Sequence, residues 1–129
     1  MPLNYVIDKQ RRLVTSTASG AVTYSELISH QNALKNDPDF DATFDQLVDG
    51  TRVTKLELTT DNVRAIARQR LFAAGSRQAF ATSSEFAFGM ARMFELYRDS
   101  AGTGRLVKVF NGLEAAQEWL QHDREVQEA

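Results

Sequence analysis

The sequence contains no cysteine among its 129 residues and has only two prolines, two histidines and one tryptophan. The lack of cysteine excludes a disulfide, a thiolate metal site and a cysteine nucleophile. No stretch approaches the roughly 20 consecutive apolar residues that a membrane-spanning helix requires. The segment from Met1 to Tyr5 also lacks the basic residues and the apolar run of a signal peptide. We therefore expect a soluble, cytoplasmic protein.

The chain also lacks a strong excess of either charge. Its formal net charge of −2 does not favour binding to nucleic acid or to an anionic membrane. A composition of 43% hydrophobic and 25% charged residues is typical of a soluble globular protein. No internal repeat, low-complexity tract or linker divides the chain. We predict one domain over residues 1–122, followed by a charged tail over residues 123–129.

Strand patterns come first along the chain. Alternation over residues 3–7 and a Val- and Thr-rich segment over 13–18 predict a hairpin that ends at Ser19-Gly20. A short strand at 46–48 is predicted to end at Asp49-Gly50, followed by an irregular connection. Further strands are predicted at 78–82 and 106–110. The last of these is bulky on both faces, which predicts a place in the interior of the sheet.

Four helices are predicted between and after these strands. Thr23 and Glu26 form a capping-box pattern, and a second helix begins within residues 59–62. Ser83 or Ser84 caps a third helix, and Asn111 caps the fourth. The predicted buried stripe of the third helix consists of Phe86, Met90, Met93, Phe94 and Tyr97. The order ββαβαβαβα predicts an α/β domain with a mixed, mostly parallel five-stranded sheet and flanking helices.

Polar residues after the predicted middle strand are the first candidate site. Asp49 either faces a ligand crevice at the strand end or serves as a turn residue before Gly50. Thr59 and Thr60 are candidate phosphoacceptors or partner contacts, and a hydroxyl here also suits a simple helix cap. A phosphate would meet the positive end of the helix dipole. Asp61 and Arg64 extend this candidate surface.

Phe88 is the second candidate. On a helical wheel it lies opposite the predicted apolar stripe, so we expect either an exposed contact for a protein partner or a second copy, or burial under a neighbouring loop. The two histidines, His30 and His122, are far apart in sequence and lack a ligand pattern, so we expect ordinary surface or boundary residues. The residues indicate no cofactor and no metal.

Catalysis has little support in the residues. The chain has no Gly-x-Ser-x-Gly elbow, no metal constellation and no acid–base pair near a histidine.

The charged residues are unevenly distributed along the chain. All charged residues between Asn62 and Ser84 are arginines, whereas those from Asp37 to Asp49 are aspartates. These segments either attract an acidic or phosphorylated partner, pair two subunits, or form solvated faces.

Three strings carry a resemblance to a known family: residues 44–49, residues 89–95, and residues 109–111 leading into 113–116. With the order of elements, they make nearly the whole chain resemble the STAS superfamily, the fold of bacterial anti-sigma-factor antagonists (SpoIIAA-like). The resemblance is greatest to an uncharacterised bacterial branch called STAS/SEC14-like. These residues are mainly core and capping positions, so they specify a fold more than a chemistry.

The resemblance implies a place for a switch. In the antagonists a phosphorylatable serine lies in an Asp-Ser-Ser-Gly string at the start of the second helix. The matching residues here are 58–62, where the aspartate and glycine are missing and threonine replaces serine. The sequence thus favours a non-enzymatic module that docks a protein partner through this helix start and forms a homodimer. The SEC14-like label implies an alternative, a small apolar or lipid-like ligand in an internal cavity of roughly 300 Å³ or more, lined by Met90, Met93, Phe94 and strand residues.

Overall fold

The apolar and alternating segments of the chain pair into one sheet. The computed structural model describes residues 3–102 and 104–128, within which there are five strands and four helices. The strands are β1 (Leu3–Asp8), β2 (Leu13–Thr23), β3 (Asp45–Glu57), β4 (Arg77–Thr82) and β5 (Leu106–Asn111). The helices are α1 (Tyr24–Lys35), α2 (Thr60–Ala67), α3 (Glu85–Ser100) and α4 (Leu113–Glu128). This is the predicted element order.

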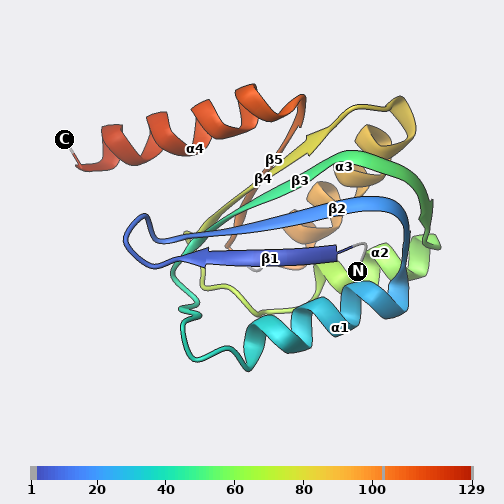
Figure 1. The fold of residues 1–129 in the computed structure, drawn as a ribbon, viewed down its shortest axis with the longest axis horizontal. Helices are drawn as coiled ribbons and strands as arrows, with labels where there is room; N and C mark the ends of the chain where they lie inside the picture. Colours follow the sequence, from blue (N-terminus) through green and yellow to red (C-terminus); the bar gives the residue numbers. More distant parts are fainter. Residues whose placement is uncertain (1–2, 103, 129) are drawn as a thin grey trace.

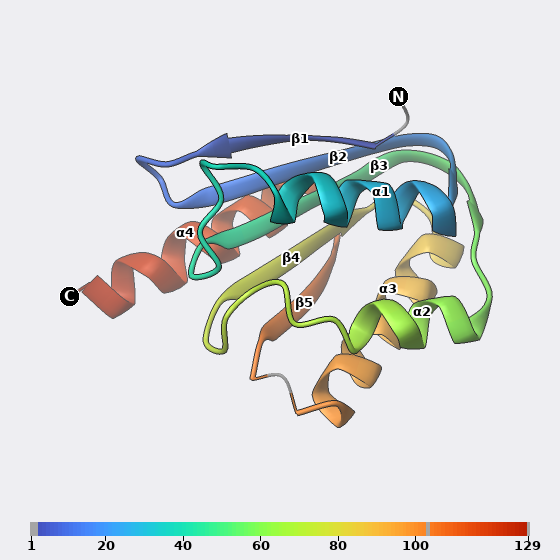
Figure 2. The ribbon, with the colours of Figure 1, turned by 90° about the horizontal axis from the view of Figure 1, so that it is seen from below.

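The sheet order follows the chain order, β1-β2-β3-β4-β5. β1 and β2 form the predicted antiparallel hairpin, and the other neighbours are parallel. Each crossover therefore steps in the same direction, and right-handed crossovers of this kind place their helices on one face. Figures 1 and 2 show α1, α2 and α3 on that face and α4 alone on the other. The mixed, mostly parallel sheet with flanking helices is confirmed.

Two strands are longer than predicted. β2 continues past Gly20 to Thr23, and β3 continues past Asp49 and Gly50 to Glu57. The pairing of β2 with β3 runs through register irregularities, so the polar and glycine residues lie within the strands. Gly50 has no positive φ, and a Cβ there would lie 3.2 Å from the Ala81 carbonyl oxygen. Position 50 therefore requires a glycine because the neighbouring strand lies close to it, and not because the chain turns there.

The prediction that the last strand is interior was wrong. β5 is an edge strand, and Leu106 on it is 51% exposed. Its bulky residues alternate between a buried face, with Val107 and Val109, and a more open one. Helices on both sides of an edge strand can bury bulky side chains without a second neighbouring strand.

The helix starts follow the sequence signals closely. Thr23 and Glu26 form the predicted capping box, and Ser84 caps α3 through the amide of Ala87. The prediction that Asn111 caps the last helix was wrong, because Asn111 is the final residue of β5 and Gly112 separates it from Leu113, where α4 begins. α4 includes most of the segment predicted as a charged tail, and the side chains beyond residue 122 lie outside the part that the structure describes.

The buried stripe of α3 differs from the predicted one. The stripe consists of Ala87, Ala91, Phe94 and Arg98, whereas Phe86 is 61% exposed. Ala87 and Ala91 lie on the face of α3 toward the sheet, and the larger residues of the predicted stripe lie to the side of that face. There Met90, Met93 and Tyr97 pack with Val63 and Phe94 in a cluster between α2, α3 and β5.

Candidate functional site

The start of α2 forms the exposed surface that the sequence predicts. The Thr59 hydroxyl accepts a hydrogen bond from the Asn62 amide at 3.1 Å, and the Asn62 side chain accepts from the Thr59 amide at 3.0 Å. This capping box gives Thr59 a structural role. Thr60 and Asp61 are exposed, and Asp61 pairs with Arg64 at 3.6 Å. Arg64 also lies over the ring of Tyr97.

Asp49 and Phe88 do not join this surface. Asp49 lies inside β3, where its carboxylate accepts hydrogen bonds from the backbone amide and the hydroxyl of Thr51 at 3.1 and 2.6 Å. It is neither at a strand end nor before a turn, which corrects the prediction. Phe88 is half-buried in a shallow surface groove with Lys108 and Trp119, instead of projecting from the helix start.

A cavity of about 160 Å³ lies between the sheet and the three helices α1, α2 and α3. Its floor comes from β2, β3 and β4, and its walls come from all three helices. Most of its lining is apolar and includes Val22, Val48, Leu56, Leu58, Val63, Ile66, Phe80 and Met90. The sequence predicted a larger cavity, of roughly 300 Å³ or more, lined by Met90, Met93, Phe94 and strand residues, and that volume was wrong. Met90 and Phe94 line it, and Met93 lies in the neighbouring cluster.

Part of the cavity wall belongs to a chain of buried polar side chains in which donor and acceptor are fixed for each hydrogen bond. Arg105 Nη2 donates to Gln46 Oε1 at 3.2 Å, and Gln46 Nε2 donates to Ser16 Oγ at 3.0 Å. Because arginine can only donate, Gln46 must turn its oxygen toward it. Gln78 Nε2 then donates to the same Gln46 oxygen at 2.8 Å. This leaves Gln78 Oε1 buried and without a hydrogen-bond partner.

The chain continues through a buried histidine. Ser16 Oγ lies 2.9 Å from His30 Nε2, and His30 Nδ1 lies 3.0 Å from Gln31 Oε1. An Nδ1–H tautomer lets the serine donate to Nε2 and the histidine donate to Gln31. Gln31 Nε2 in turn donates to Gln69 Oε1 at 3.3 Å, which connects α1 with the segment after α2.

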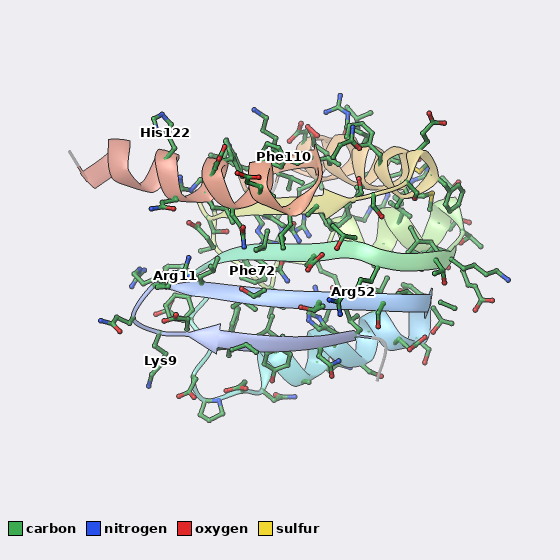
Figure 3. The ribbon with its side chains drawn as sticks, turned by 45° about the horizontal axis from the view of Figure 1, so that its top comes forward. Lys9, Arg11, Arg52, Phe72, Phe110 and His122 are labelled. Carbon is green, nitrogen blue, oxygen red and sulfur yellow. The ribbon has the colours of Figure 1, made fainter. Side chains whose placement is uncertain are left out.

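The sequence predicted that His30 is a surface or boundary residue, whereas the structure buries it. It is 8% exposed, and burial lowers its pKa below the usual 6.5. Its ring also meets Tyr5 edge to face, with centroids 5.6 Å apart. Figure 3 shows the other histidine, His122, pointing away from the sheet on α4. Only His122 fits the expected exposed position.

Arg98 of α3 is a buried cation on the cavity wall, 3% exposed. Its two terminal nitrogens donate to the carbonyls of Gln69 and Ile66, near the end of α2. Its Nε is buried without a hydrogen-bond partner. Burial, with a contribution from Arg70, lowers the pKa of Arg98 to about 10, so the group stays positively charged at neutral pH.

The comparisons with known proteins decide the fold. No protein-family model and no curated protein matches the chain. One solved structure matches 92% of this chain and 91% of its own, with 16% sequence identity and a TM-score of 0.59. It is an uncharacterised protein of the DUF3478 family from Shewanella loihica PV-4, described as having a SpoIIAA-like fold. This chain has a SpoIIAA-like fold.

The buried charge of the SpoIIAA-like domain is unbalanced. Within the described part of the chain, the fully buried charged residues are Arg77, Arg98, Arg105 and a single acid, Asp45. Asp45 accepts hydrogen bonds from the backbone and the guanidinium of Arg77 at 2.8 and 2.9 Å. The predicted acidic and basic surface segments therefore contribute one partner each to an interior ion pair. Among described side chains, no carboxylate forms an ion pair with Arg98.

Two further features of the SpoIIAA-like domain concern function classes. Across residues 3–102 and 104–128, no three His, Cys, Asp or Glu side chains gather where a metal ion could bind. None of the helices described has the length and apolar composition needed to cross a membrane.

Sequence reasoning missed the polar wall because each member looks ordinary alone. Ser16, Gln46 and Gln78 lie on three neighbouring strands, at positions that face the helices. A signal was nevertheless present, because Gln46 and Gln78 each begin a predicted strand and are followed by apolar residues. Polar residues at such positions are costly unless they are hydrogen-bonded, and they therefore merit attention.

Proposed function

We propose that this chain is a non-enzymatic binding module that holds a small, mostly apolar ligand between its sheet and the helices α1, α2 and α3. The observation that carries the proposal is the apolar cavity of about 160 Å³ bounded by every helix on that face. A cavity of about 150 Å³ in a protein interior accommodates a molecule of the size of benzene. The size favours a small molecule over a lipid with long chains.

The test is to add a neutral apolar probe and to fill the cavity. Toluene should raise the thermal midpoint of the protein and produce chemical-shift changes at residues lining the cavity. Ala91 lines the cavity and is buried, so Ala91→Leu should abolish the effect of toluene while the protein stays folded. Ala65→Leu is the matched control, because Ala65 is exposed on α2. Equal toluene binding by wild type and Ala91→Leu would refute the proposal.

A second candidate function is docking of a protein partner, or of a second copy of this chain, through the start of α2. The supporting observation is that Thr60 and Asp61 are exposed while Thr59 alone supplies the cap. Thr60 is therefore free of the main structural task at this helix start.

Thr60→Glu should change this docking without changing the fold. The added charge would lie near the positive end of the helix dipole, so the thermal midpoint should stay nearly constant. Sedimentation velocity of wild type and variant would measure self-association, and capture from the native cell would measure other partners. A large loss of stability would show instead that Thr60 has a structural role, and unchanged association would remove this candidate.

A further inference from the structure

Two residues that line the cavity each have a polar atom without a hydrogen-bond partner, although their side chains are more than nine-tenths buried. Gln78 is 6% exposed and its Oε1 accepts no hydrogen bond, while Arg98 is 3% exposed and its Nε donates none. Both residues line the cavity described above. A buried polar atom without a partner lowers the stability of the protein, so a ligand that satisfied both atoms would gain affinity.

The chemistry of each atom is determined by its surroundings. The Gln46 oxygen accepts from Arg105, so Gln78 must direct its amide nitrogen to Gln46 and leave its own oxygen open. The open oxygen requires a donor on the ligand. Arg98 Nε is a donor, so it requires an acceptor.

The charge around Arg98 favours an anionic acceptor. Asp45, the buried acid, pairs with Arg77 at 2.9 Å, and Arg98 and Arg105 repel each other, which contributes to the lowered pKa of Arg105. The two backbone carbonyls that Arg98 binds, those of Ile66 in α2 and Gln69 after it, supply only partial negative charge. Arginine binds carboxylates through charge-assisted hydrogen bonds, which are roughly twice as strong as neutral ones.

We propose that the cavity binds a small apolar carboxylic acid that also carries a hydroxyl group, with its carboxylate at Arg98 Nε and its hydroxyl donating to Gln78 Oε1. This inference rests on the proposed function, because it needs the cavity to accept a ligand. The apolar remainder of the ligand packs against side chains such as Val63 and Met90. The cavity volume limits the ligand to about the size of one aromatic ring.

The first experiment compares toluene, benzamide, benzoate and the three hydroxybenzoate isomers on the wild-type protein by calorimetry and NMR. Benzoate should bind roughly 10- to 100-fold more tightly than benzamide, as expected for a hydrogen bond between charged groups. At least one hydroxybenzoate isomer should bind more tightly than benzoate. The Nε–H resonance of Arg98 should shift with benzoate and not with toluene.

Variants separate a ligand contact from a structural role. Arg98→Gln keeps an amide donor for the carbonyls of Ile66 and Gln69 and removes the charge, so it should lose the preference for benzoate and retain toluene binding. Arg68→Gln is the matched control, because it removes one exposed positive charge from the residue that follows α2. Gln78→Leu should remove the preference for the hydroxylated acid alone.

The outcomes distinguish this inference from the proposed function. Equal affinity for benzoate and benzamide, with toluene bound, would overturn the carboxylate assignment and leave the proposed function intact. Equal affinity for benzoate and all three isomers would overturn the role of Gln78. If none of the probes bound, the proposed function would fail and this inference with it. The wild-type comparison decides the matter even if a variant does not fold.

Discussion

The two faces of the sheet are both apolar at their centres, yet they are filled in different ways. Under α4, Leu47 and the alanines at 79, 81 and 116 pack together with Leu120. Figure 3 shows Phe110 on this side, beneath α4, where its ring meets Trp119. On the other face, three helices enclose a cavity, an arginine and a chain of polar side chains. The same strands therefore support a close-packed face and a face with room for a ligand.

This difference shows how alternate residues of a strand can serve two tasks. In β4, Ala79 points toward α4, whereas Gln78 and Phe80 belong to the cavity lining. Interior packing is dense, and empty volume costs stability whether or not it serves a ligand. Three experiments would sharpen or break this contrast between the faces.

The largest effect is expected from shortening a side chain on the close-packed face. Leu47 is 4% exposed in the cluster under α4, so Leu47→Ala should lower the free energy of unfolding by about 2–5 kcal/mol. Urea denaturation measures this change. Leu58→Ala, at the border of the existing cavity, should cost clearly less. Equal losses for the two variants would contradict the difference in packing.

Enlarging an alanine should show the reverse contrast, with a smaller effect. Ala79 is fully buried under α4, so Ala79→Leu should overpack that face and cost about 1–3 kcal/mol. Ala91→Leu extends into the cavity and should change the free energy of unfolding by less than about 1 kcal/mol. Thermal denaturation of both variants measures the difference. If Ala91→Leu were the more destabilising, the cavity could not be empty space available to a ligand.

The smallest effect concerns pH and the polar face. Burial holds the pKa of His30 in the folded protein below its usual 6.5. At a pH between this lowered pKa and 6.5, the unfolded chain binds a proton that the folded protein does not. This contribution to stability is complete above pH 6.5 and declines as the pH falls below it. His30→Asn should remove the decline, and His122→Asn, on the exposed histidine, should not.

Asp37 and Asp41 do not obscure this window. The carboxylates of Asp37 and Asp41 have pKa values held below 3.8 by backbone hydrogen bonds from Asp39 and Thr43, so their contribution is lost only at lower pH. Denaturant midpoints measured from pH 7.5 to pH 4.5 separate the two ranges. A wild-type midpoint that stayed constant below pH 6.5 would contradict the burial of a neutral His30.

The sequence was sufficient to predict the element order and most of the helix starts. Local signals determine these features. A capping hydroxyl, as at Thr23 and Ser84, bonds the backbone amide of the residue three positions later, so the pattern can be read from the sequence alone. The SpoIIAA-like fold was predicted for the same reason, since its core and capping positions are distributed along nearly the whole chain.

Features that depend on distant neighbours were predicted wrongly or missed. β3 continues through Asp49 and Gly50 because β2 lies beside it, and no local signal reports that partner. The buried stripe of α3 includes two alanines and Arg98 because the fold determines which face of the helix meets the sheet, whereas hydrophobicity alone favours the larger Phe86. The polar wall exists because the fold brings together side chains from β2, β3, β4 and α1, such as Ser16 and His30.

The position of α4 in the chain has a consequence for biosynthesis. A ribosome makes all five strands before it makes this helix, which alone covers the face containing Leu13 and Leu47. During translation that face stays open to water and to other nascent chains until α4 leaves the exit tunnel. We expect chains that terminate before Leu113 to aggregate or to recruit chaperones, because their apolar face has no cover.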